Sequence, residues 1–247
     1  MSLQISIDTG GTFTDFVCME ESGARRVYKI HSIPENPARA VVEGLQQIAA
    51  DRGVALAALL ADTGNLYLST TISTNAVITG AGARVGLLTT KGFRDILEMR
   101  RGSREHLYDN KTPPPPPLVP RYLRLPIEER INSAAEVVIP LNREDVANAA
   151  AAMKRDNVEA VAIAYLHAYG NAEHERQSAT LLAELLPEMY LSVSSDVASE
   201  IGIYERTSTA VLNAYCGPLV KRFLGQFQET IQENGYRGAS LVMQSNG

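Results

Sequence analysis

The chain has 247 residues, of which 45% are hydrophobic and 21% are charged, a balance typical of a folded globular protein. Its formal net charge of −5 gives no electrostatic basis for bulk binding to nucleic acid or to an anionic membrane surface. The length allows one large hydrophobic core or two smaller domains.

The two cysteines and the N-terminus narrow the class further. Cys18 and Cys216 lie far apart in apolar runs and form no CxxC pair, so we expect two buried thiols and neither a zinc site nor a disulfide. The N-terminus lacks the charged and apolar regions of a signal peptide. No apolar run approaches the ~20 residues that span a bilayer. We therefore expect a cytoplasmic protein.

The first part of the chain predicts an antiparallel meander. Apolar residues alternate over 3–7, and strand patterns follow at 13–19 and 26–33. Asn36 and Pro37 are typical of a helix N-cap and first turn. Further on, the sequence predicts strands at 66–69 and 85–89 and helices at 74–80 and 92–99.

The second half predicts a layered α/β arrangement. Helices at 142–155 and 171–186 each precede an apolar strand, and such α-β units indicate at least partly parallel pairing. Asn142 is a predicted N-cap, with Asp145 in the capping-box position. A long helix over 203–234 is expected to break near Gly217-Pro218. A last strand over 239–244 runs into Ser-Asn-Gly, a turn signal, so we expect the fold to be incomplete at this point.

Five consecutive prolines at 113–117 exclude a helix or a central strand there and predict an extended polyproline segment. The segment is interpreted as a rigid surface strap; a ligand for a signalling module is the alternative.

The segment Ile-Asp-Thr-Gly-Gly-Thr-Phe-Thr-Asp at 7–15 suits triphosphate binding. Gly10 and Gly11 permit unusual backbone angles and close approach of a phosphate, and successive N–H groups in such a turn form an anion-binding nest. Asp8, on the strand face opposite Ile5 and Ile7, is placed to orient Mg²⁺. Hydroxyl donors come from three threonines: Thr9, Thr12 and Thr14. A plain hairpin turn is the alternative. No lysine follows the glycines and a strand continues, so this is not a P-loop.

Three further segments carry polar chemistry. Residues 69–76, which include Thr71 and Asn75, run into a predicted helix N-terminus. The segment is interpreted either as a site for an anion or a polar substrate or as an ordinary Ser/Thr-rich N-cap. Residues 94–104 contain four arginines. They are interpreted either as a binding site for a carboxylate or phosphate or as a solvated charged loop. His106 and Asp109 are too loosely spaced, without a third ligand, to indicate a metal site.

Residues 199–209 contain adjacent Glu205 and Arg206, which point in different directions on a helix. They form either the wall of a substrate pocket or a buried polar helix start, and the sequence leaves both open.

Together these segments resemble the hydantoinase A/5-oxoprolinase family, which includes subunits of acetone and acetophenone carboxylases. The matching stretches are IDTGGTFTDFV at 7–17, STTISTNAVI at 69–78, TKGFRDILEMRRGSREHLYD at 90–109, YERTSTAVLNAY at 204–215 and LVMQSNG at 241–247. They run in the same order from end to end. Ser69 stands where a glycine is expected before the Thr-Thr pair.

The resemblance implies an actin/sugar-kinase/Hsp70-like (ribonuclease H-like) ATPase fold, α/β with a mixed sheet and helices flanking the meander. It implies residues 1–198 as the N-terminal family domain and 199–247 as the start of the hydantoinase A domain. Asp8 is then the Mg²⁺-orienting acid. Phosphate or nucleotide contacts fall on Thr9, Gly10, Gly11, Thr12, Thr14, Thr71 and Asn75, and catalytic roles on Asp8, Glu205 and Arg206.

The family couples ATP cleavage, with Mg²⁺, to phosphorylation of a carbonyl oxygen, and works with a B-type subunit. The resemblance therefore implies an ATP-dependent cyclic-amide hydrolase subunit, with a ketone carboxylase subunit or a non-catalytic assembly subunit as alternatives. The second phosphate loop and the adenine site are expected beyond Gly247. A hetero-oligomer and a small carbonyl substrate follow from the same resemblance.

Overall fold

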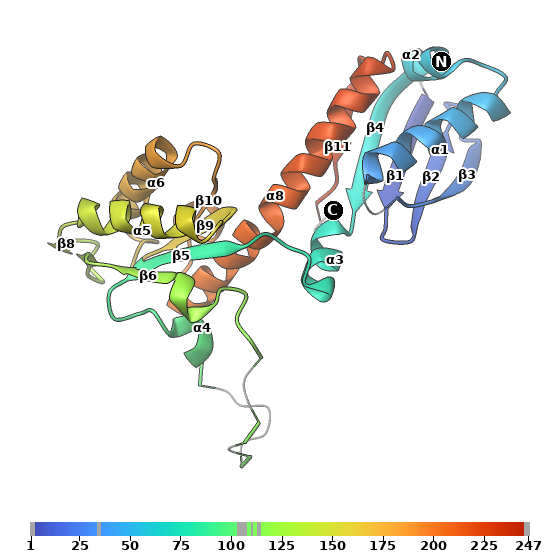
Figure 1. Ribbon diagram of the computed structural model, residues 1–247. Helices are drawn as coiled ribbons and strands as arrows, with labels where there is room; N and C mark the ends of the chain where they lie inside the picture. The colour runs from blue at the N-terminus through green and yellow to red at the C-terminus, as the bar shows by residue number, and fades with distance from the viewer. Residues whose placement is uncertain (1–2, 34–35, 103–107, 110, 113–114, 245–247) are drawn as a thin grey trace. The chain divides into compact units, whose positions relative to one another are not determined.

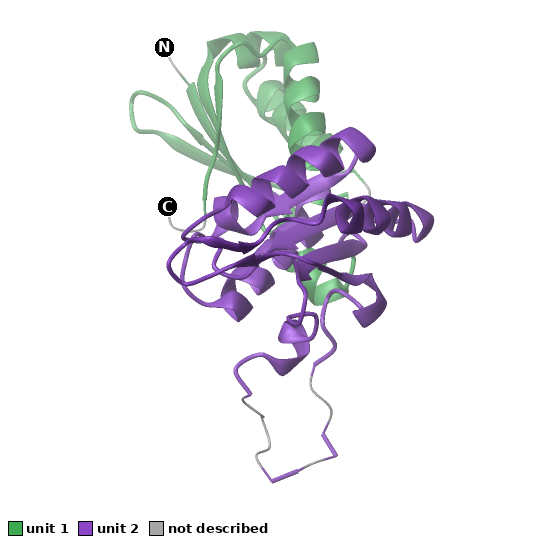
Figure 2. Cartoon of the chain, turned by 90° about the vertical axis from the view of Figure 1, so that its left-hand side faces the viewer, with its two compact units in different colours: residues 1–81, 219–247 green, residues 82–218 purple. Residues whose placement is uncertain are grey.

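The computed structural model describes residues 3–33, 36–102, 108–109, 111–112 and 115–244. The chain divides into two compact units, drawn in different colours in Figure 2. Unit 1 comprises Met1–Ala81 and Leu219–Gly247, and unit 2 comprises Gly82–Pro218. Each unit has its own sheet and its own hydrophobic core. The expected family boundary after residue 198 is not tested by this division and stays a prediction.

Unit 1 is built on a five-stranded mixed sheet with the strand order β11-β4-β1-β2-β3 (Figure 1). Its strands are β1 (Leu3–Thr9), β2 (Phe13–Met19), β3 (Arg25–His31), β4 (Thr63–Thr70) and β11 (Ala239–Val242). β1, β2 and β3 form the predicted antiparallel meander, whereas β4 runs parallel to both β1 and β11. The predicted mixed α/β fold with an N-terminal meander is confirmed.

One face of this sheet carries the core of unit 1. Because strand side chains alternate between faces, Leu3, Ile5 and Ile7 are buried while Asp8 is exposed. Helices α1 (Pro37–Asp51), α2 (Leu56–Asp62) and the C-terminal half of α8 (Ile203–Glu233) contribute to the same core. Asn36 caps α1 as predicted, since its side chain accepts a hydrogen bond from the Arg39 N–H. The other sheet face is exposed at polar Ser6, Asp8 and Lys29, and it also bears the exposed pair Val17 and Val27.

Unit 2 is built on a four-stranded sheet with the order β10-β9-β5-β6, in which every pair is parallel. The strands are β5 (Val85–Thr90), β6 (Arg124–Ile127), β9 (Ala160–Ala164) and β10 (Tyr190–Val193). Helices α5 (Arg143–Arg155) and α6 (Glu173–Leu185) pack against it. Shorter elements are α4 (Ile96–Met99), η1 (Arg121–Leu123), β7 (Arg130–Ile131), β8 (Val137–Ile139) and α7 (Ser194–Val197). The expected parallel α/β layer is confirmed.

Several local expectations are corrected. The helix predicted over 92–99 is only the short α4, because Gly92 has a φ of 97° and residues 91–95 form a turn. α8 is continuous through Pro218, which removes one N–H but lies within the helix. At the neighbouring Gly217 a β-carbon would lie 2.3 Å from Cζ of Tyr190, so glycine here serves close packing rather than a break.

The cap of α5 also differs in detail. The Asn142 side chain accepts from the N–H groups of Glu144 and Asp145, as an N-cap should. The Asp145 carboxylate, however, accepts from the Glu128 N–H at 2.9 Å and does not close a reciprocal capping box. Asp145 therefore ties α5 to the end of β6.

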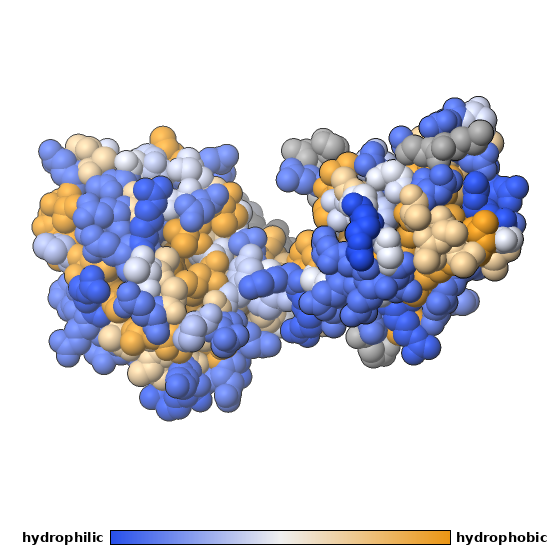
Figure 3. All heavy atoms as spheres, turned by 90° about the horizontal axis from the view of Figure 1, so that it is seen from above, coloured by the Kyte–Doolittle hydropathy of each residue, from blue (hydrophilic) through white to orange (hydrophobic). Residues whose placement is uncertain are grey.

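In the proline run, residues 115–117 have no regular secondary structure, while 113–114 lie outside the described residues, so the choice between strap and ligand stays open. None of the helices in the described part of the chain is both long and apolar enough to cross a membrane. On the face drawn in Figure 3, hydrophobic patches lie among hydrophilic residues in both units.

Candidate functional site

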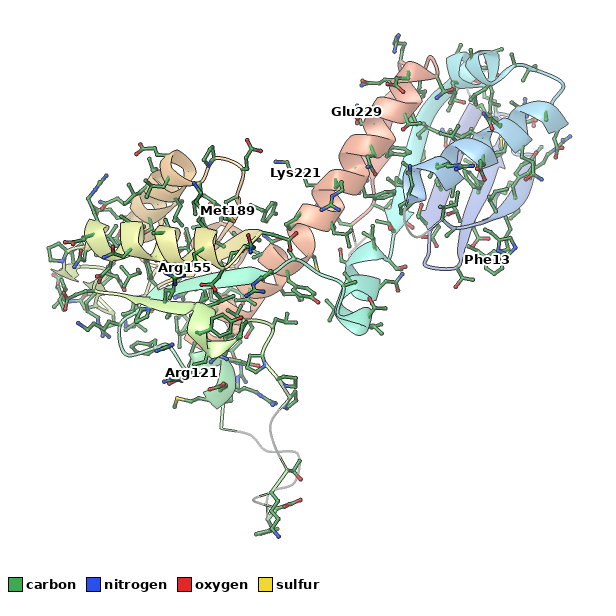
Figure 4. The ribbon with its side chains drawn as sticks, viewed as in Figure 1. Phe13, Arg121, Arg155, Met189, Lys221 and Glu229 are labelled. Atoms are coloured by element: carbon green, nitrogen blue, oxygen red, sulfur yellow. The ribbon has the colours of Figure 1, made fainter. Side chains whose placement is uncertain are left out.

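The β1–β2 turn is tight because the Gly10 N–H donates to the Phe13 carbonyl at 3.0 Å. Figure 4 labels Phe13 at this end of the hairpin. Neither glycine of the turn has a positive φ, so the expectation of unusual backbone angles is wrong. Space favours the glycines: a β-carbon at Gly10 would lie 3.0 Å from the Phe13 backbone oxygen, and one at Gly11 would lie 2.9 Å from Nδ2 of the flexible Asn75 side chain, which would have to move.

Two N–H groups at the tip of the turn are available to a ligand. Gly11 and Thr12 are exposed, and among the residues that the structure describes neither N–H donates a hydrogen bond. The Gly10 N–H is already used within the hairpin. Adjacent free N–H groups on a turn are the donors of an anion nest. The turn therefore offers two N–H donors to an anion, fewer than the sequence suggests.

The second polar segment lies against this turn. The Thr71 N–H and the Thr70 hydroxyl both donate to the Thr9 carbonyl, at 3.3 and 3.1 Å. Helix α3 (Ile72–Thr79) begins directly afterwards, and its N-cap Thr71 makes no side-chain cap bond. Asn75 Nδ2 lies 3.4 Å from Thr71 Oγ1 and faces Gly11. Two segments some 60 residues apart are thus brought together beside one turn.

Asp8 is exposed on the open face of the sheet, at the last outward-facing position of β1, with Thr9 between it and the turn. The Ser69 hydroxyl, in register with it on β4, donates a hydrogen bond to Asp8 Oδ1. On the other side, Asp15 of β2 stands directly opposite Asp8, and the Lys29 ammonium lies 3.0 Å from Asp15 Oδ1.

Two of the predicted hydroxyl donors point away from this face. Thr14 is fully buried, and its hydroxyl lies 3.0 Å from that of Ser32, which donates to the Gly10 carbonyl at 2.7 Å. The Thr9 side chain is also buried, and its hydroxyl has no partner among the described residues. Because both hydroxyls are buried, neither is exposed beside the turn in this structure, and the phosphate contacts expected of Thr9 and Thr14 stay a prediction. The hydroxyls of Thr14 and Ser32 hold the buried side of the turn. The Thr12 side chain remains exposed.

Glu205 and Arg206 belong to unit 2 and do point in different directions. Arg206 is buried, and its guanidinium donates to the Ser194 hydroxyl at 3.0 Å and to the carbonyls of Glu200 and Tyr165. Burial lowers the pKa of Arg206. Burial and these protein acceptors favour the buried polar helix start, and the catalytic role of Arg206 stays a prediction.

Glu205 lies on the surface and pairs with Arg101. The hydrogen bond from Arg101 lowers the pKa of the Glu205 carboxyl. Of the other predicted arginines, Arg94 donates to the Arg121 carbonyl at 2.9 Å. Arg104 and His106 lie outside the described residues. Of the described arginines in this stretch, Arg94 and Arg101 therefore make side-chain bonds to other residues of unit 2.

Sequence reasoning missed two buried acids in unit 2. Glu175 accepts from the Tyr165 N–H at 2.9 Å, the Ser194 hydroxyl at 2.6 Å and the Ser195 N–H at 2.9 Å. Glu129 is buried, and its carboxylate lies 2.8 Å from His174 Nδ1. Glu175 is a lone acid on α6 and Glu129 a lone acid in the connection between β6 and β7. Either resembles a solvated residue, so no sequence pattern reveals them.

Comparisons with known proteins agree with this architecture. Residues 4–186 match the model of the hydantoinase/oxoprolinase N-terminal region. The chain is 36% identical to caprolactamase subunit alpha of Pseudomonas jessenii over 99% of its own length and 35% of the relative. It is 32% identical to the acetophenone carboxylase gamma subunit of Aromatoleum aromaticum, over 98% of this chain and 35% of that one.

Two solved structures show the same fold. The ATP-dependent caprolactamase of Pseudomonas jessenii superposes with a TM-score of 0.90, covering 98% of this chain and 36% of that chain at 36% identity. Nucleotide-free acetone carboxylase superposes with a TM-score of 0.87, covering 97% and 36% at 28% identity. The chain thus spans about a third of the length of the relatives it matches.

Proposed function

The chain belongs to the hydantoinase/oxoprolinase family, and from this premise we propose that it is part of an ATP-dependent enzyme subunit that phosphorylates a carbonyl oxygen, most directly that of a cyclic amide. The observation that carries the proposal is the turn of unit 1. Its free N–H groups at Gly11 and Thr12 lie beside the start of α3, and Asp8 lies on the open face just before them.

The residues at this turn fit a phosphate and its cation. The missing β-carbon of Gly11 leaves the backbone accessible next to the Asn75 amide. N–H donors at a turn and at a helix N-terminus favour a phosphate oxygen. Asp8 supplies an exposed carboxylate of the kind that binds Mg²⁺ together with phosphates. When bound, Mg²⁺ would neutralise phosphate charge.

In the proposed reaction the amide oxygen attacks the γ-phosphorus of ATP, the bond to the bridging oxygen breaks, and ADP leaves. The phosphorylated amide carbon is a better electrophile, so a first water adds to it and the C–N bond breaks, which frees the amine and leaves an acyl phosphate. A second water hydrolyses the acyl phosphate to the carboxylate and inorganic phosphate. The residues of unit 1 would orient the phosphates in line with the amide oxygen and stabilise the charge that develops in transfer. A B-type partner subunit would supply the residues for the hydrolytic step.

The alternative is a ketone carboxylase subunit, in which an enol phosphate is joined to bicarbonate. Similarity to acetophenone and acetone carboxylases supports it, at 32% and 28% identity against 36% for caprolactamase. An assembled complex assayed for ADP release separates the two. Stimulation by cyclic amides supports hydrolysis, and stimulation by ketones with bicarbonate supports carboxylation.

Asp8→Asn tests the site itself. It keeps the shape of the side chain but removes its charge, so ADP release should fall by about a hundredfold or more. Asp51→Asn, at the exposed end of α1, is the matched control and should retain activity. Full activity in Asp8→Asn would exclude this turn as the phosphate site and would favour a non-catalytic assembly role.

A further inference from the structure

Four side chains form one row across the open face of the unit 1 sheet. The register aligns Lys29 of β3 with Asp15 of β2, Asp15 with Asp8 of β1, and Asp8 with Ser69 of β4. Aligned residues on neighbouring strands place their side chains on the same face at close distance. The row lies close to the glycine turn. Its charges therefore attract or repel a charged ligand bound at that turn.

The row contains two carboxylates that stand directly opposite each other. Like charges in that arrangement repel, and two free carboxylates together would attract a bare divalent cation and repel a triphosphate. Lys29 changes this balance. Its ammonium lies 3.0 Å from Asp15 Oδ1 and 4.8 Å from the centre of the Phe13 ring, so it is held between the turn and Asp15.

Ser69 forms a hydrogen bond with the other carboxylate of the row, that of Asp8. Its hydroxyl donates to Oδ1 of Asp8, which fixes the orientation of that carboxylate, while no salt bridge engages Asp8 among the described residues. Ser69 is also the last residue but one of β4, and Thr71 caps α3 just beyond it. The orientation of Asp8 is therefore coupled to the segment that lies against the turn.

We propose that Lys29 and Ser69 are specificity-determining and positioning residues of the phosphate site: Lys29 neutralises Asp15 and Ser69 orients Asp8, so that the turn selects a cation already bound to nucleotide phosphates over the free cation. This inference rests on the proposed function.

Calorimetric titration of the assembled complex that contains this chain, with MgCl₂ alone and separately with ATP at saturating Mg²⁺, tests it. Lys29→Met keeps the length of the side chain and removes its charge. Binding of Mg²⁺ alone should become about fivefold tighter and binding of Mg-ATP about fivefold weaker, the scale of one exposed charge pair. Lys91→Met is the control, because Lys91 forms a comparable exposed pair with Glu128 at 3.0 Å in unit 2, and both affinities should stay unchanged.

Ser69→Ala should weaken Mg-ATP binding, and Ser69→Thr, which keeps the hydroxyl, should restore it. If the assembled complex that contains the unmodified chain does not bind Mg-ATP, the proposed function is overturned and this inference with it. If that complex binds Mg-ATP but both Lys29→Met affinities move in the same direction, or neither moves, the inference alone is overturned. Circular dichroism spectra matching those of the unmodified chain exclude misfolding as the cause.

Discussion

Asn75 of α3 faces Gly11 of the β1–β2 turn so closely that a β-carbon at Gly11 would lie 2.9 Å from the Asn75 amide nitrogen. The amide also lies 3.4 Å from the Thr71 hydroxyl. Since the atom that is crowded ends a flexible side chain, Gly11→Ala should displace it at little cost to the fold. We expect a loss of nucleotide affinity with a change of less than about 1 kcal/mol in the free energy of unfolding.

Titration with Mg-ATP and urea unfolding measure the two quantities on the same Gly11→Ala protein. A large loss of stability with unchanged affinity would show that the turn is structural only.

Two glycines inside helices should respond to alanine in opposite directions. In α1 a β-carbon at Gly44 would lie 2.1 Å from Cζ of Phe16, within the core of unit 1, whereas at Gly225 of α8 nothing lies within 4 Å. Gly44→Ala should therefore destabilise by about 1–3 kcal/mol through overpacking. Gly225→Ala should stabilise by about 0.5–1 kcal/mol, because alanine loses less conformational entropy in a helix. Urea unfolding curves of both variants give the comparison, and equal signs would contradict it.

The sequence predicts the strands of unit 1 and the parallel layer of unit 2 because hydrophobic periodicity reports burial directly. The same periodicity applies at the site. If Asp8 points outward, Thr9 must point inward, and Thr14 likewise follows the alternation of β2 into the core. Strand alternation therefore distinguishes these two threonines from Thr12, which lies in the turn and is exposed.

Other features lie beyond the reach of local pattern. The crowding at Gly11 comes from Asn75, and the bonds of Glu175 come from Ser194 and Tyr165, all distant in sequence. Only the tertiary fold brings these atoms together. A helix that passes through Pro218 is a similar case, since tertiary packing overrides a local signal.

Arg206 joins three segments of unit 2, since it donates to the Ser194 hydroxyl and to the carbonyls of Tyr165 and Glu200. Arg206→Met should leave these acceptors unpaired in the interior and destabilise by about 3 kcal/mol. Arg222→Met, at an exposed position of the same helix, should change stability by less than about 0.5 kcal/mol.

Thermal unfolding and ATP turnover of Arg206→Met are read together at a temperature at which the variant is folded. A stable protein without activity would favour the catalytic role that the family resemblance implies.

Both cysteines should be unreactive in the native protein. Cys18 is 2% exposed and Cys216 is 8% exposed, and burial raises the pKa of each thiol, which leaves less of the reactive thiolate. An aromatic disulfide reagent at pH 8 should therefore release little colour from folded protein and two equivalents after unfolding in urea. Rapid reaction of either thiol at native conditions would indicate local opening of its unit.

The carboxyl of Asp95 should make stability depend on pH in a defined direction. Arg121 Nε and Nη2 donate to its two oxygens at 2.8 and 3.0 Å, and these hydrogen bonds hold the pKa of Asp95 below its ordinary value of 3.8. In Figure 4 Arg121 is labelled beside α4, which Asp95 precedes. Because the folded-state pKa is depressed, the stabilisation is fully present above the unfolded-state pKa and is lost as pH falls through the folded-state value.

Asp95→Asn should accordingly be less stable than the unmodified protein at pH 7, with a gap that closes as the pH falls below about 4. The effect is small since the pair is exposed, and 1 M salt should reduce it further. The urea midpoints of both proteins between pH 7 and pH 2 measure the gap, and Arg121→Met should remove the same pH-dependent part. A gap that stays constant over this range would mean that the Asp95 charge does not contribute to stability.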